Sequence, residues 1–230
     1  MSADSGQFKP VPEKQAQDLP GTEQAMKPKS EPTKLQRKDQ FHEYRAANKL
    51  GGTCSRAVKK HVDEFGKIHV LVNNASKQIM CSDFKDINLD DVESTFRSNI
   101  LQMFAITKHA LPDMEAGGSI INSASTVAFR GEASMVNYAS TKGAITSFTQ
   151  SLAKQLISKG IRVNAVAPGP VHTPLQPASR PAEQMEGFGR DSELGRPGQP
   201  SEIAPSFVFL ASKDAELYNG QVLHAYPLGD

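Results

Sequence analysis

The stretch NYASTK, residues 137–142, opens a predicted helix around which the rest of the chain is arranged. Tyr138 and Lys142 are four residues apart, so their side chains lie on the same helix face, one turn from each other. A free phenol titrates near pH ~10, and a nearby ammonium group favours its ionised form. The pair therefore predicts a tyrosine that exchanges protons near neutral pH. The same spacing also arises by chance on amphipathic helices, so its meaning depends on the neighbouring segments.

Apolar patterns on both sides of this helix predict alternating strands and helices. Short apolar runs predict buried strands over 68–74, 119–123, 161–167 and 221–226. Helical spacing predicts helices over 55–65, 90–114 and 201–211, the last capped by Ser201, and the helix of Tyr138 ends near Gly160. The irregular residues 174–199 predict a mobile flap. The alternation predicts an α/β fold with a parallel sheet, helices on both of its faces and ligands at the carboxyl ends of the strands.

Composition divides the chain into a polar arm and one domain. Hydrophobic residues make up 38% and charged residues 22% of the 230 residues, values typical of a globular domain. Residues 1–50 are instead rich in Lys, Gln, Glu and Pro, with few large apolar side chains. We expect this arm to be mostly disordered, or to lie across a neighbouring subunit, and residues 51–230 to form the domain.

Charge and residue usage argue against several classes of partner. The 26 basic and 25 acidic residues leave a net charge of +1, which provides no field for binding nucleic acid. No segment has the apolar length of a signal peptide or a membrane span, so we expect a cytoplasmic protein without a membrane partner. Cys54 and Cys81 match no metal-ligand spacing and are interpreted as structural, and the histidines show no zinc-like pair, so no metal is expected.

Four signatures, in the family's order, make residues 55–230 resemble the short-chain dehydrogenase/reductase family. The segment 73–76, Asn-Asn-Ala-Ser, is similar to the family's Asn-Asn-Ala-Gly, and the segment 168–173, Pro-Gly-Pro-Val-His-Thr, is similar to its Pro-Gly-x-x-x-Thr. Asn99 matches the family's helix asparagine, and Ser125 precedes Tyr138 by thirteen residues, as the catalytic serine does. The arm, with Pro-Gly-Thr-Glu at 20–23, resembles members related to glucose and ribitol dehydrogenases. The resemblance implies a Rossmann-like parallel sheet.

The resemblance also implies a role for each matching residue. Tyr138 would exchange a proton with an alcohol or carbonyl oxygen, and Lys142 would lower the Tyr138 pKa and hold the nicotinamide ribose. Ser125 would hydrogen-bond the reacting oxygen, and Asn99 would hold a water that links Lys142 to solvent. Taken singly, Ser125 remains open to interpretation as a strand-end turn residue, and Asn99 as a residue that bonds the backbone of a kinked helix.

The implied cofactor is NADP or NAD, and the sequence does not distinguish them. By the same resemblance, its binding residues are Asn74, Ala75, Tyr138, Lys142, Val171 and Thr173. The family's glycine-rich turn and its flanking strands are not found in the sequence. We interpret this as a contiguous block of two to three strands skipped between about Leu50 and Cys54. The N-terminal strands are therefore predicted to be incomplete. Without this turn, the backbone N–H groups that hold the pyrophosphate are missing, and cofactor binding is expected to be weakened.

Two functions follow from the resemblance. The first is an NAD(P)-dependent oxidoreductase that interconverts an alcohol and a carbonyl compound by hydride transfer, with a small-molecule substrate and a homo-oligomeric assembly. The alternative is a non-catalytic, truncated family member that acts by association with intact subunits. The missing glycine turn favours the second function, and the complete proton-transfer set favours the first.

Overall fold

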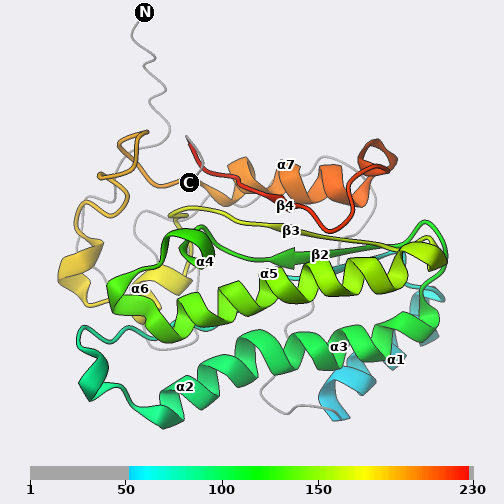
Figure 1. The fold of residues 1–230 in the computed structure, drawn as a ribbon, viewed down its shortest axis with the longest axis horizontal. Coiled ribbons are helices and arrows are strands. Elements are labelled where there is room, and N and C mark those ends of the chain that lie inside the picture. Colours follow the sequence, from blue (N-terminus) through cyan, green and yellow to red (C-terminus); the bar gives the residue numbers. More distant parts are fainter. Residues whose placement is uncertain (1–51, 228–230) are drawn as a thin grey trace, which may run out of the picture.

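A four-stranded parallel sheet forms the centre of the computed structural model, which describes residues 52–227 (Figure 1). The strands lie side by side in chain order: β1 (Val70–Asn73), β2 (Ser119–Ser123), β3 (Arg162–Val166) and β4 (Val222–Leu223). All three pairings are parallel, with Leu71 opposite Ile120 and Ile120 opposite Val163. The α/β, Rossmann-like sheet predicted from the sequence is confirmed. The last strand is shorter than predicted, with two residues in place of six.

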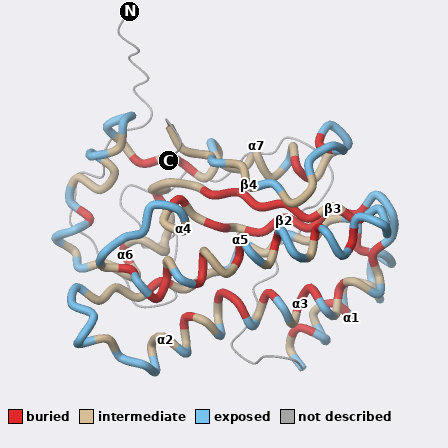
Figure 2. The backbone as a smooth tube through the Cα atoms, in the orientation of Figure 1, coloured by how far each residue is buried: buried red, intermediate tan, exposed pale blue. Residues whose placement is uncertain are grey.

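The two middle strands are buried on both faces (Figure 2). Ile120 of β2 and Val163 of β3 pack into one core cluster. Ile121 and Val166, on the same two strands, pack into another on the opposite face. All four side chains are completely buried. This explains why β2 carries two successive apolar residues, Ile120 and Ile121, where a strand with one buried face would alternate between apolar and polar residues.

Seven α-helices lie among the described residues. They are α1 (Gly52–Phe65), α2 (Leu89–Phe96), α3 (Gln102–Ala110), α4 (Val127–Arg130), α5 (Val136–Leu156), α6 (Leu175–Ser179) and α7 (Pro200–Ala211). Apolar residues of α1, α3 and α5 share the core cluster of Ile120, and α7 packs on the opposite face through Leu210 (Figure 1). Helices therefore lie on both faces of the sheet, as predicted.

The long helix predicted over 90–114 is interrupted. A π-helical turn, Arg97–Leu101, lies between α2 and α3, and a 3-10 turn, Leu111–Asp113, follows α3. A π turn carries one extra residue in the helical register, and such turns are frequent at functional sites. Asn99 lies within this turn.

Two smaller predictions are corrected. The cap of α7 is Gln199 and not Ser201, because the Glu202 carboxylate accepts a hydrogen bond from the Gln199 N–H at 2.8 Å. Glu202 does lie in the first turn, as expected. The segment 174–199 holds α6 and a 3-10 turn, Ala182–Met185, and is therefore more regular than the sequence indicated.

β1 lies at one edge of the described sheet. Within residues 52–227 it pairs with β2 as its single neighbouring strand, and Val72 is 42% exposed. The polar arm predicted over residues 1–50 lies outside the described residues. None of the helices described between residues 52 and 227 combines the length and apolarity needed to cross a bilayer.

Replacing Ile120 by alanine is expected to lower the free energy of unfolding by about 2–5 kcal/mol, because the change leaves a cavity between the sheet and its covering helices. Chemical denaturation monitored by circular dichroism measures the loss. Ile157→Ala is the matched control, since Ile157 is 63% exposed and its truncation should change stability by less than about 0.5 kcal/mol. Equal losses in the two variants would contradict the assignment of the core.

Candidate active site

Tyr138 lies near the start of α5, with Ser125 beside it at the end of β2. Tyr138 is 7% exposed, and the hydroxyls of Ser125 and Ser76 lie close enough to its phenol to act on its pKa through hydrogen bonding. Ser125 follows β2 by two residues, and its hydroxyl also approaches the Pro168 carbonyl at 3.5 Å. The predicted serine and tyrosine are therefore brought together, thirteen residues apart in the chain.

Burial dominates the electrostatics of the phenol. It raises the pKa of Tyr138 to about 12, while the Ser125 and Ser76 hydroxyls and the positive charge of Arg180 act in the opposite direction. The sequence predicted a lowered pKa caused by Lys142, and the structure corrects this expectation. The free energy needed to remove the phenolate from water exceeds the stabilisation that the surrounding hydrogen-bond donors and positive charge provide.

Lys142 is buried one turn further along α5. Its Nζ donates a hydrogen bond to the Ser123 carbonyl at 2.7 Å and lies 5.3 Å from the centroid of the Tyr138 ring. The shared helix face predicted from the spacing is confirmed by this contact. Burial lowers the pKa of Lys142 to about 7, so the amine carries only part of its charge at neutral pH. A partly neutral lysine explains why burial of the phenol prevails.

Asn99 joins three segments of the chain. Its side chain accepts a hydrogen bond from the Lys77 N–H at 2.7 Å and donates to the Lys77 carbonyl at 2.9 Å. It also donates to the Thr141 hydroxyl at 3.0 Å, next to Lys142 in the chain. From its place in the π turn, Asn99 thus connects the loop after β1 to α5.

The predicted cofactor-binding residues follow neighbouring strands. Asn74 and Ala75 come directly after β1 and are exposed, and Val171 and Thr173 follow β3. Because β1, β2 and β3 are parallel neighbours, these segments leave the sheet at the carboxyl ends of the strands, where Ser125 also follows β2.

Close packing holds the segment after β3 in place. An added Cβ at Gly169 would lie 1.9 Å from a ring carbon of Tyr226, so only glycine fits beneath this ring without displacing it. The Thr126 N–H donates to the Pro168 carbonyl at 3.1 Å, which joins the same segment to the loop of Ser125. The segment is therefore positioned from two sides, by the end of β2 and by the residues after β4.

Sequence reasoning missed three residues of the site. Ser76 and Arg180 act on the phenol, and Gln78, which is 2% exposed, donates to the Ser179 hydroxyl at 3.1 Å. Ser76 had a visible signal, since it replaces the glycine of the resembled motif. Arg180 and Gln78 had none, because only folding brings the charge of Arg180 within range of Tyr138 and joins Gln78 to Ser179, 101 residues away in the chain.

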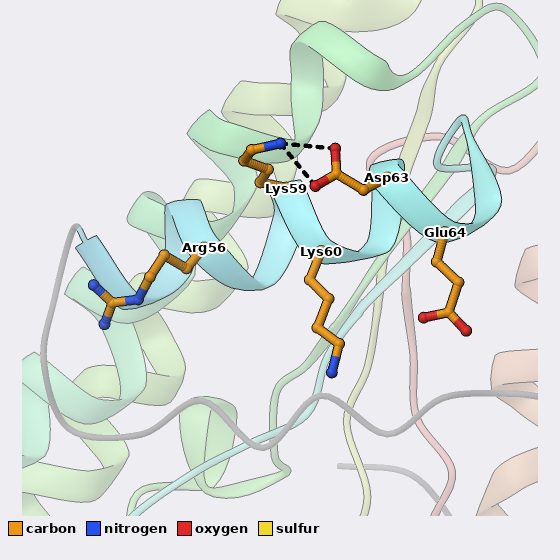
Figure 3. A pocket seen from close by; sticks show the side chains of 5 residues that line it. All are labelled: Arg56, Lys59, Lys60, Asp63 and Glu64. Carbon is orange, nitrogen blue, oxygen red and sulfur yellow. Dashed lines mark hydrogen bonds and ion pairs between the residues drawn. The ribbon is translucent and has the colours of Figure 1, made fainter.

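A hollow along α1 lies away from Tyr138. Its lining consists of charged side chains of a single helix, with Lys59 paired to Asp63 at 2.7 Å (Figure 3). Both partners of this pair are largely exposed, so the hollow is a solvated helix face. Between residues 52 and 227, no cluster of three or more His, Cys, Asp or Glu side chains is arranged to hold a metal ion.

Comparisons with known proteins agree with this geometry. A family model described as enoyl-(acyl carrier protein) reductase matches residues 45–225. The chain is 50% identical over 171 residues to the glucose and ribitol dehydrogenase of Daucus carota, with 74% of this chain and 59% of that protein covered. It is also 50% identical over 172 residues to the NADPH-dependent aldehyde reductase 1, chloroplastic, of Arabidopsis thaliana, with 74% and 60% covered. The chain thus spans about three-fifths of the length of these curated relatives.

A solved structure shows the same fold. A short-chain dehydrogenase from Burkholderia cenocepacia, in complex with NADP, aligns with a TM-score of 0.68 and 28% identity. The alignment covers 75% of this chain and 69% of that chain. With the four ordered motifs and the grouping of Ser125, Tyr138 and Lys142, these matches give one conclusion: the chain belongs to the short-chain dehydrogenase/reductase family of oxidoreductases.

Proposed function

We propose that this chain is an NAD(P)-dependent oxidoreductase that interconverts an alcohol and a carbonyl compound. The observation that carries the proposal is the convergence of the Ser125 hydroxyl, the Tyr138 phenol and the Lys142 amine at the carboxyl ends of parallel strands. Ligands of open α/β sheets bind at the carboxyl ends of the strands. The relatives are named as a glucose and ribitol dehydrogenase and an NADPH-dependent aldehyde reductase, and these names support the reaction class.

Each residue has a distinct part in this proposal. Ser125 donates a hydrogen bond to the substrate oxygen and steadies the negative charge that develops there. In the direction of reduction, Tyr138 passes its phenolic proton to that oxygen, and in the direction of oxidation it takes the proton back. Asn99 positions the loop after β1 against α5 and, through a water, connects Lys142 to solvent.

The residues present fit the nicotinamide half of the cofactor. An ammonium group has three donors, and Lys142 uses one of them on the Ser123 carbonyl, so two would be available to the ribose hydroxyls. The carboxyl ends of β1 and β3 are followed by Asn74, Ala75, Val171 and Thr173. When bound there, the reduced nicotinamide supplies a hydride to the carbonyl carbon. No glycine-rich turn follows a strand within residues 52–227, so we propose that the cofactor is held weakly.

The second candidate is a non-catalytic relative that associates with intact subunits. It is favoured by the single neighbour of β1 in the described sheet. An apolar surface on α3 and α5 is available for such an assembly, because Phe104 is 52% exposed and packs on Phe148 with ring centroids 4.6 Å apart.

Tyr138→Phe separates the two candidates. An enzyme should lose about 100-fold or more in kcat, because the substitution removes the proton donor and retains the ring. The measurement is the oxidation of NADPH in the presence of small aldehydes. Tyr218→Phe, away from the site, is the matched control and should retain the activity. No turnover in the unmodified chain and in either variant would favour the interaction protein.

Weak cofactor binding is checked by following NADPH and NADH fluorescence on titration with the purified chain. Without a pyrophosphate cradle, the expected apparent Kd lies above about 100 μM for both nucleotides. Saturation at low micromolar concentration would overturn the proposal of weakened binding. Lys142→Met should weaken the residual binding further, whereas Lys154→Met, an exposed position on the same helix, should not.

The lowered pKa of Lys142 makes stability depend on pH. Below pH 7 the folded chain buries a charged amine, which opposes folding. Above this pH the folded state releases the proton while the unfolded chain still holds it, so the destabilisation by Lys142 relaxes as the pH rises toward 10.5.

Lys142→Met should therefore raise the free energy of unfolding most at low pH. The excess over the unmodified chain is expected to shrink by about 2–3 kcal/mol between pH 6 and pH 9. Urea denaturation at a series of pH values measures this trend, with Lys154→Met as the control. A pH-independent difference would show that Lys142 keeps its charge in the folded chain.

A further inference from the structure

Ser76 adds a second hydroxyl to the phenol of Tyr138. It occupies the position at which the resembled motif carries glycine, so its side chain is a departure from that motif. Its Oγ is buried and finds no hydrogen-bond partner of regular geometry among the described residues, although it lies near enough to the phenol to act on its pKa. Buried hydroxyls are normally satisfied, so an unsatisfied one beside a reactive group points to a ligand atom as its partner.

The two residues after Ser76 hold this hydroxyl in place. Lys77 is fixed through its backbone N–H and carbonyl by Asn99, and the buried Gln78 side chain donates to the Ser179 hydroxyl at 3.1 Å. The loop after β1 is thus joined both to the π turn and to the end of α6. This second contact brings the residue after Ser179, Arg180, toward the same phenol.

Arg180 is preorganised beside Tyr138. Its Nε donates to the Gln176 side chain at 3.0 Å, and its guanidinium carbon lies 5.3 Å from the centroid of the Phe188 ring. The guanidinium is partly buried, and its charge interacts with Tyr138 and with Glu132. An arginine has five N–H donors, and the bond to Gln176 uses only one of them.

We propose that Ser76 and Arg180 hold a second oxygen of the substrate, next to the oxygen bound by Ser125 and Tyr138, so that preferred substrates carry a hydroxyl group on the carbon beside the carbonyl. The inference rests on the proposed function and names its substrate class, an α-hydroxy carbonyl compound or the corresponding vicinal diol. Ser76 both donates and accepts hydrogen bonds, and Arg180 donates, which matches a neutral hydroxyl. A carboxylate fits less well, because Glu132 also faces Arg180.

A turnover assay with two aldehydes of equal size tests this preference. Glycolaldehyde and propionaldehyde have the same number of heavy atoms and differ by a hydroxyl in place of a methyl group. With NADPH, the unmodified chain should show the higher kcat/KM for glycolaldehyde. Ser76→Ala should lower kcat/KM for glycolaldehyde about 5- to 10-fold more than it lowers kcat/KM for propionaldehyde, the effect of one hydrogen bond lost to glycolaldehyde alone. Ser140→Ala, an exposed serine on α5, is the matched control.

A second measurement is independent of turnover and of the cofactor. The chain is labelled with 13C at the tyrosine Cζ position, and Tyr138→Phe identifies the Tyr138 resonance. Ethylene glycol and 1-propanol, the alcohols that correspond to the two aldehydes, are titrated separately. Ethylene glycol should shift the resonance at lower concentration than 1-propanol, and Ser76→Ala or Arg180→Met should abolish this difference while circular dichroism shows an unchanged fold.

The outcomes distinguish this inference from the proposed function. If neither aldehyde is reduced but ethylene glycol is preferred in a manner that depends on Ser76, the proposed function fails and the second-oxygen site stands. If the aldehydes are reduced without preference, or if Ser76→Ala retains the preference in both measurements, the second-oxygen site is overturned and the proposed function stands.

Discussion

The hydrogen bond from Lys142 Nζ to the Ser123 carbonyl fixes the geometry on which the site depends. It joins α5 to the end of β2, and thereby sets Tyr138 on one element against Ser125 on the other. A lysine amine is a costly anchor inside a protein, because its charge opposes burial. The chain accommodates it by lowering the pKa of the amine to about 7, so that a partly neutral amine donates the bond.

The same burial shapes the chemistry of the phenol. Burial raises the pKa of Tyr138 to about 12, which leaves the phenol protonated at neutral pH. This state suits donation of a proton to a carbonyl oxygen, the step of reduction. The surrounding groups, two serine hydroxyls and the Arg180 guanidinium, all favour the phenolate, so each would support the transfer as it occurs.

Asn99 shows how one side chain can serve both fold and site. The two readings of this residue from the sequence were a water-holding catalytic asparagine and a backbone-bonding residue of a kinked helix. The structure shows the bonds to Lys77 and a π-helical turn, and these bonds hold the loop that carries Ser76. A structural contact here positions a loop beside the Tyr138 phenol, so the two interpretations are not exclusive.

The sequence by itself determined the parallel α/β architecture, the limits of β2 and the pairing of Tyr138 with Lys142, because these follow from local periodicity and from spacing along one helix. It did not determine the direction of the Tyr138 pKa, the interruption of the helix at Asn99, the action of Ser76 and Arg180 on the phenol, or the contact of Gln78 with Ser179. Only the tertiary structure decided these, because desolvation depends on which distant segments cover a group, and the contact from Gln78 to Ser179 spans 101 residues of chain.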